Sequence, residues 1–476
     1  MLLTVAGARL AGGSGGWWFH PELGARDANT VALYAGMALL SIAWLGLWRH
    51  LSAGTAQPRE LVPVGVLWSL PLVLGAPLFS HDVYSYLAQG TIAHLGLSPY
   101  RTAPSVLGSL GHAHVMNAVD PFWRHATAPY GPLFLAIMSG IATIAGAHLI
   151  AGVLLTRIVV LAGLVLVWMF VPRLARAAGA DPTRAVWLAA LSPLVLLQLV
   201  SPSHNDLLMV GLLVAGVTFA AEDRPLVGIA ICAIAMTIKL PAGLAVAFIA
   251  VAWLRDAAGW RERLRGIAAT VLAVAAAVAI VSVATGWGLH WVSSTLFSTP
   301  ARVRLAITPA TNVAWTLSSL LHDIGVNARF LHVESVTRAV SGALAGAVTI
   351  VLLVRARREN MVRLLGLALV ALALGGPAAW PWYFSWGVVL LAATLPFQRR
   401  RVVPVALIAG AFVVKANGIL ALPLRTAPIV LAVYVLVAAA ALYLWTRRRR
   451  GGARGNALPG PVRSAPSSAL ARSSPG

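Results

Sequence analysis

Long apolar stretches dominate the chain, and polar residues are confined mainly to the shorter segments between them. An α-helix needs about 20 apolar residues to cross the roughly 30 Å hydrocarbon core of a membrane, and many of these stretches approach that length. The pattern predicts an all-α, polytopic integral membrane protein with about 13 transmembrane helices. The expected spans lie at 30–48, 61–79, 152–172, 185–200, 207–221, 226–238, 240–254, 266–286, 335–354, 361–377, 383–397, 402–421 and 427–446.

Composition and charge agree with this class. The chain is 59% hydrophobic and only 11% charged, whereas a soluble domain is about half apolar and a quarter charged. We interpret the net charge of +22 as a topology signal and a contact with anionic membrane lipid, and we expect no nucleic-acid partner. The arginines gather in segments that the positive-inside rule assigns to the cytoplasm: 173–184, 255–265, 355–363, 398–401 and 447–454.

One apolar segment conflicts with the charge rule. If 131–149 and 152–172 both crossed, the polar region that begins at residue 80 and the Arg-rich segment 173–184 would lie on the same side. We therefore expect 131–149 to stop short, so that a large first extracytoplasmic loop region runs over 80–151 and contains interfacial helices.

A second segment, 226–254, contains Lys239 and Pro241 near its middle. A single crossing would bury the lysine in the membrane centre, whereas two short half-helices would place it at the outer surface. The loop charges favour the two half-helices.

The two ends of the chain are expected to lie outside the membrane. Residues 1–29 are interpreted as an extracytoplasmic segment, and no cleavable signal peptide is evident in them. Residues 447–476 are rich in Arg, Ser, Pro and Gly and lack acidic residues, which predicts a disordered, basic cytoplasmic tail.

Three of the 14 acidic residues sit in polar, aromatic or amide-rich clusters on the expected outer side. They are Asp82 in SHDVYSYLAQG, Asp120 in VDPFWRHATAPYGP and Asp206 in SPSHND. A carboxylate in such a place can act as a general base. Alternatively, Asp82 and Asp206 are N-caps of the helices that follow them. The residues alone leave both interpretations open.

Five motifs together resemble a known family. They are SHDVYSYLAQG, LSPYR, VDPFW with APYGPL, LSPLVLLQLVSPSHNDLLMVGLL and WPWYFSW, in that order. The sequence resembles the actinobacterial polyprenyl-phosphate-mannose-dependent α-1,6-mannosyltransferases of the GT-C superfamily, which build the mannan core of lipomannan-type glycolipids. The resemblance covers residues 30–446, which would be a GT-C transmembrane catalytic domain in the plasma membrane with its active site on the extracytoplasmic side.

The resemblance implies a mechanism as well. The family places its catalytic acid near the start of the first extracytoplasmic loop, which makes Asp82 the expected general base, with His81 orienting it or binding substrate. Many GT-C enzymes have paired acids at this point, whereas this chain has a single one, so we expect neither a metal nor another cofactor. Mannose would pass with inversion from polyprenyl-phosphate mannose to a mannan or lipoglycan acceptor. A transporter or flippase of a polyprenyl-linked sugar is the alternative, although the sequence shows no inverted repeat.

Other residues are candidates for substrate binding. Cations could bind the departing phosphate, aromatic rings could stack on sugars or isoprene units, and polar residues near Asp206 could hold hydroxyls. For the arginines the alternative is solvent or lipid headgroups, and for the aromatic residues it is the interfacial belt. The cations are Arg101, Arg124, Lys239, Arg302 and Arg304; the aromatic residues are Tyr84, Tyr86, Tyr100, Trp123, Tyr130, Trp380, Trp382 and Tyr383; the polar residues are Asp120, His204, Asn205 and Asp206.

Overall fold

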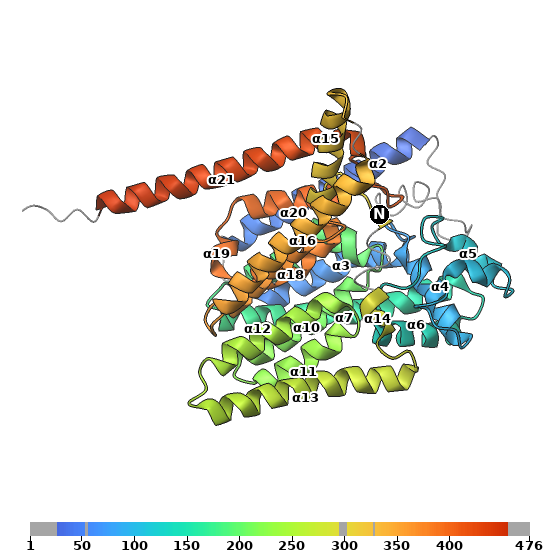
Figure 1. The fold of residues 1–476 in the computed structure, drawn as a ribbon, viewed down its shortest axis with the longest axis horizontal. Helices are drawn as coiled ribbons and strands as arrows, with labels where there is room; N and C mark the ends of the chain where they lie inside the picture. The colour runs from blue at the N-terminus through green and yellow to red at the C-terminus, as the bar shows by residue number, and fades with distance from the viewer. Residues whose placement is uncertain (1–25, 53–55, 295–301, 327–328, 456–476) are drawn as a thin grey trace, which may run out of the picture.

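The computed structural model describes residues 26–52, 56–294, 302–326 and 329–455 (Figure 1). This part of the chain is helical, and its one isolated β-bridge joins Val414 to Leu420. The first half contains α2 (Arg26–Ser52), η1 (Pro58–Leu61), α3 (Val62–Leu74), α4 (Asp82–His94), η2 (Pro104–Gly108), α5 (Ala113–Ala118), α6 (Pro132–Ala145), α7 (Leu149–Ala177), α8 (Pro182–Ala189), α9 (Pro193–Val195), the π-helical η3 (Leu196–Val200) and α10 (Asp206–Ala221).

The second half continues the bundle. It contains α11 (Pro225–Met236), η4 (Leu240–Ala242), α12 (Gly243–Leu254), α13 (Trp260–Thr285), α14 (His290–Ser293), α15 (Pro309–Asp323), α16 (Phe330–Val354), α17 (Met361–Gly375), η7 (Pro381–Phe384), α18 (Ser385–Ala392), α19 (Leu395–Gln398), α20 (Val402–Phe412), η8 (Leu424–Thr426) and α21 (Ala427–Gly455).

Several of these helices suit a membrane. Within the described residues, 5 helices are long and apolar enough to cross one by length and composition, and further apolar helices are shorter. Few residues of α13 and α16 are fully buried in the protein, as in helices that face lipid, whereas nearly all residues of Pro182–Val200 are buried within the bundle. The chain is therefore a helical membrane protein, and the count of about 13 spans stays a prediction.

One pair of tryptophans packs α2 against the buried segment Pro182–Val200. The indole rings of Trp44 in α2 and Trp187 in α8 stack with centroids 4.2 Å apart. Each ring N–H donates to the other residue's backbone carbonyl, at 3.0 Å and 2.9 Å. A buried indole needs such a partner, and here each ring satisfies the other.

The short helices α4, η2, α5 and α6 gather at one end of the bundle, and we call residues 80–148 the α4–α6 cluster (Figure 1). The helix α6 has 14 residues, about 21 Å, which is shorter than the hydrocarbon core. The helix α3, which is expected to cross, has only 13 residues, so the expectation that 131–149 stops short stays a prediction. The segment 226–254 forms two helices, α11 and α12, with Lys239 at the break between them.

Some expected boundaries are wrong. The span expected at 402–421 ends at Phe412, because a turn with Gly418 at φ 82° folds the chain back through the Val414–Leu420 bridge. The span expected at 383–397 is broken after Ala392 and resumes at Leu395, next to a proline at position 396.

Three further corrections concern helix ends and a missed helix. α2 begins at Arg26, inside the segment expected to precede the first span, and α3 stops at Leu74, short of the expected 79. α21 continues to Gly455, past the expected start of the tail at 447, because its arginines are good helix formers. Residues 456–476 and 1–25 lie outside the described residues. No span was expected at 309–323, where α15 forms, because its polar residues break the apolar run.

Candidate active site

A cavity of about 570 Å³ opens between the start of α4, the break between α11 and α12, and the aromatic segment at η7. Its lining brings together residues that are far apart in the sequence. From the set expected to form the site, it includes His81, Asp82, Asp120, Trp123, Tyr130, Lys239, Trp380, Trp382 and Tyr383.

Asp82 is the first residue of α4, and its carboxylate does not cap the helix. The N-cap is His81, which makes no side-chain cap either. Instead, the backbone N–H of Asp82 donates to Ser80 Oγ at 3.1 Å. The carboxylate therefore remains available to the cavity, with 22% of the side chain exposed. The interpretation of Asp82 as a helix cap is wrong.

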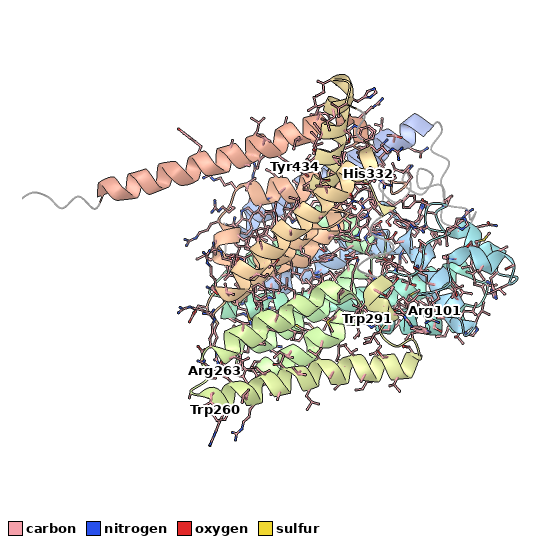
Figure 2. The ribbon with its side chains drawn as sticks, viewed as in Figure 1. Arg101, Trp260, Arg263, Trp291, His332 and Tyr434 are labelled. Atoms are coloured by element: carbon pink, nitrogen blue, oxygen red, sulfur yellow. The ribbon has the colours of Figure 1, made fainter. Side chains whose placement is uncertain are left out.

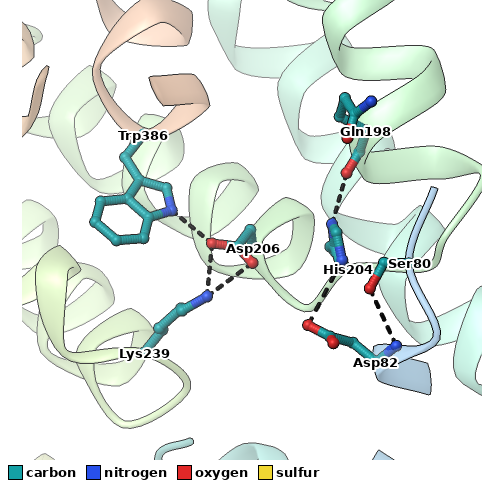
Figure 3. A network of polar contacts seen from close by, with 7 residues as sticks. All are labelled: Ser80, Asp82, Gln198, His204, Asp206, Lys239 and Trp386. Carbon is teal, nitrogen blue, oxygen red and sulfur yellow. Dashed lines mark hydrogen bonds and ion pairs between the residues drawn. The ribbon is translucent and has the colours of Figure 1, made fainter. Parts of the chain in front are cut away.

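A buried histidine, His204, lies next to the Asp82 carboxylate (Figure 3). His204 Nε2 lies 3.6 Å from Asp82 Oδ2, and His204 Nδ1 lies 2.6 Å from the backbone carbonyl oxygen of Gln198. Because a carbonyl only accepts, Nδ1 carries the proton and the lone pair of Nε2 faces the carboxylate. Burial lowers the pKa of His204, while the negative charges of Asp82 and Asp206 oppose that change.

A buried arginine forms hydrogen bonds to the turn that carries His204. Arg157 in α7 donates from Nε to Ser203 Oγ at 3.3 Å and from Nη2 to the backbone carbonyl of Ser201 at 3.4 Å. It also donates to the backbone carbonyl of Val73 in α3. Ser203 has φ 62°, so the turn is held in a backbone conformation that non-glycine residues seldom adopt.

Asp206 and Lys239 form a buried ion pair (Figure 3). Lys239 Nζ lies 2.8 Å from both carboxylate oxygens, and the indole N–H of Trp386 donates to Oδ1 at 2.5 Å. Asp206 is the first residue of α10, and it makes no side-chain cap. The N-cap interpretation is therefore wrong here too, and the partner that an intramembrane lysine requires is this aspartate.

Aromatic rings form one wall of the cavity. Trp380 stacks on Trp382 with centroids 4.5 Å apart, and Tyr383 stacks on Trp386 at the same distance. Lys239 Nζ lies 4.6 Å from the centre of the Tyr383 ring, within the range of a cation–π contact. These rings are packed into the site, so the interfacial belt does not account for their position.

The remaining expected residues lie outside the cavity lining. Tyr86, His204, Asn205 and Asp206 are buried behind it, and Tyr100 donates to the backbone carbonyl of Tyr130 at 2.9 Å. Their direct contact with substrate stays a prediction. The others outside the lining are Tyr84, Arg101, Arg124, Arg302 and Arg304.

The arginines among them have partners within the protein. Arg101 contacts His290 Nε2 at 2.8 Å on the surface of the α4–α6 cluster, at the opposite end of the bundle from Trp260 and Arg263 (Figure 2). Arg124 donates to two backbone carbonyls, and Arg304 pairs with Glu334 at 2.8 Å. These contacts favour a structural role over a free phosphate ligand.

Several lining residues were missed by the sequence reasoning, among them two polar residues of α4. Ser85 and Gln89 belong to α4 and follow Asp82 by three and seven positions. That spacing places all three side chains on one helical face. The signal was present in the sequence, but only the position of the cavity shows which face is used.

The described residues form a helical membrane protein, and its cavity combines a carboxylate with aromatic and apolar walls. This arrangement fits the GT-C type of membrane glycosyltransferase. Residues 5–255 match the family described as α-(1→6)-mannopyranosyltransferase, N-terminal domain, and residues 308–446 match the family described as MptB C-terminal domain.

Curated relatives agree with both matches. The chain is 35% identical to α-(1→6)-mannopyranosyltransferase A of Mycobacterium tuberculosis, over 79% of this chain and 73% of the relative. It is 33% identical to a probable α-(1→6)-mannopyranosyltransferase of Mycolicibacterium smegmatis, over 80% and 74%, and 29% identical to α-(1→6)-mannopyranosyltransferase A of Corynebacterium glutamicum, over 78% and 79%. The chain belongs to this actinobacterial α-1,6-mannosyltransferase family, and it is a mannosyltransferase. No solved structure matches it.

Proposed function

We propose that the enzyme transfers mannose from polyprenyl-phosphate mannose to a mannan or lipoglycan acceptor at the outer face of the plasma membrane. The product linkage is α-1,6, the anomeric configuration is inverted, and neither a metal nor another cofactor takes part. One observation carries the assignment of the base. The Asp82 carboxylate does not cap α4 and lines the cavity, whereas the Asp206 carboxylate is hydrogen-bonded to Lys239 and Trp386.

The chemistry follows from this placement. Asp82 takes the proton from the acceptor hydroxyl as the hydroxyl oxygen bonds to the anomeric carbon, and the bond from that carbon to the phosphate oxygen breaks. Polyprenyl phosphate leaves with the bonding electrons. The lone pair of His204 Nε2, 3.6 Å from Asp82 Oδ2, faces the carboxyl group and can accept a hydrogen bond from it once Asp82 has gained the proton.

The donor is proposed to occupy the wall formed by the α11–α12 break and α17. Met236, Leu240, Leu244 and Leu372 give that wall an apolar surface suited to an isoprenoid. Lys239 is the only lysine or arginine among the described residues that line the cavity. Two of its three N–H donors reach Asp206, so we assign the donor phosphate to the third. Asp206 then holds the ammonium group in position.

The test compares wild type with Asp82→Asn and, as a matched control, Asp120→Asn, which removes the other lining carboxylate. Each purified protein receives radiolabelled polyprenyl-phosphate mannose and a short α-1,6-mannoside. The asparagine at position 82 keeps the side-chain size but cannot act as a base, so we expect turnover to fall by about 10²–10⁴-fold, with a much smaller effect of Asp120→Asn.

Each other outcome has a definite meaning. Equal activity of wild type and Asp82→Asn would move the base to Asp120. A folded wild type that transfers no mannose from this donor would refute the proposed donor.

A further inference from the structure

The face of α4 that carries the base also carries two neutral polar side chains. Asp82, Ser85 and Gln89 line the cavity together, and the axial distance from the first to the last is about 10 Å at 1.5 Å per residue. The cavity therefore has a polar strip that runs from the base along α4.

Both side chains are buried, and the side-chain oxygen of each lacks a hydrogen-bond partner. Ser85 and Gln89 are each 4% exposed, and neither Ser85 Oγ nor the amide oxygen Gln89 Oε1 has a partner. By contrast, Thr91 on the same helix donates to the backbone carbonyl of Leu87 at 2.9 Å. Buried polar groups in native proteins nearly always have hydrogen-bond partners. Two side-chain oxygens without partners in a cavity wall therefore point to a missing ligand.

We propose that Ser85 and Gln89 form the subsite for the acceptor sugar and bind ring hydroxyls other than the one that reacts. A hydroxyl and a carboxamide each donate and accept, which suits a neutral polyol better than a phosphate. Trp123 and Tyr130 also line the cavity and supply ring faces for a sugar.

The acceptor is assigned to this strip because the base must touch the acceptor hydroxyl. Side chains on the same helical face as Asp82 contact the sugar that carries this hydroxyl and the sugar next to it. The lysine and the apolar residues that suit the donor come from the α11–α12 break and from α17 instead. This inference rests on the proposed function.

The experiment measures initial rates of mannose transfer for Gln89→Leu, Ser85→Ala and the control Thr91→Val. Thr91 lies on the same helix but on a different face, and it is not part of the lining. For Gln89→Leu we expect the acceptor KM to rise roughly tenfold, the factor for about one lost hydrogen bond, while the donor KM stays unchanged. Ser85→Ala should show a smaller rise, and Thr91→Val none.

Deoxy acceptors sharpen the test. A mannoside that lacks the bound hydroxyl should lose roughly the same factor with wild type but no further factor with Gln89→Leu, because the two changes remove one contact. The thermal midpoint of Gln89→Leu should not fall, since the substitution removes an unpartnered polar atom. If that variant does not fold, Ser85→Ala decides.

Two results would overturn the inference: an acceptor KM unchanged in both variants, or a rise confined to the donor KM. Failure of the wild type to transfer mannose is a different result, because it refutes the proposed function itself.

Discussion

The buried pair of Asp206 and Lys239 makes a quantitative prediction. Asp206 is 1% exposed and Lys239 8%, and Nζ lies 2.8 Å from both carboxylate oxygens. Removal of one partner leaves an uncompensated charge in a buried site, which costs about 3–5 kcal/mol. Since native proteins are stable by about 5–15 kcal/mol, each single substitution should remove a large part of the free energy of unfolding.

The double variant should behave differently. Lys239→Met alone and Asp206→Asn alone each leave an unpaired charge, whereas Asp206→Asn with Lys239→Met leaves no unpaired charge and keeps a carbonyl oxygen for the Trp386 N–H. We therefore expect the double variant to be more stable than the sum of the single losses by at least about 2 kcal/mol.

The measurement is reversible denaturant unfolding in detergent micelles, together with mannose transfer by the same samples. Additive losses across the cycle would refute the structural reasoning about the pair. Transfer restored in the double variant would refute the proposed role of Lys239 toward the donor phosphate, since a purely structural pair can be replaced. A stable double variant without transfer would support that role.

Two further predictions concern the support of the site. Because burial lowers the pKa of His204, the unfolded chain takes up a proton first as the pH falls below about 6.5. Stability should therefore decline on acidification below that pH, by at most about 1.4 kcal/mol per pH unit from this group, and less in His204→Asn; identical slopes in thermal melts at several pH values would contradict this. Gly131→Ala would place a Cβ 2.0 Å from the backbone carbonyl oxygen of Thr237, beside the bond from the Gly131 N–H to the Ile238 carbonyl, so it should lower the melting temperature and transfer activity. The control Gly140→Ala on α6 has open space and should stabilise by about 0.5–1 kcal/mol, and equal effects of the two substitutions would show that the close contact is wrong.

Much of the site could be anticipated because local signals mark it. Asp82 follows a long apolar run and opens a polar stretch, so its neighbours alone mark it as a candidate site residue. Lys239 and Pro241 predicted the break between α11 and α12, because neither residue suits the middle of a membrane helix. The helix ends were predicted less well, since the apolar composition continues past Leu74 and Phe412 after the helices stop.

The sequence by itself determined that this protein resides in a membrane, where its polar segments lie and which acid stands at the start of α4. These are properties of short stretches, because each residue's preference for lipid or water acts locally. Only the tertiary structure decided which groups are partners. Asp206 meets Lys239 across 33 residues and Trp386 across 180, and His204 reaches Asp82 from a turn held by Arg157. Such pairings depend on how the assembled helices pack, and no local pattern in the chain records that arrangement.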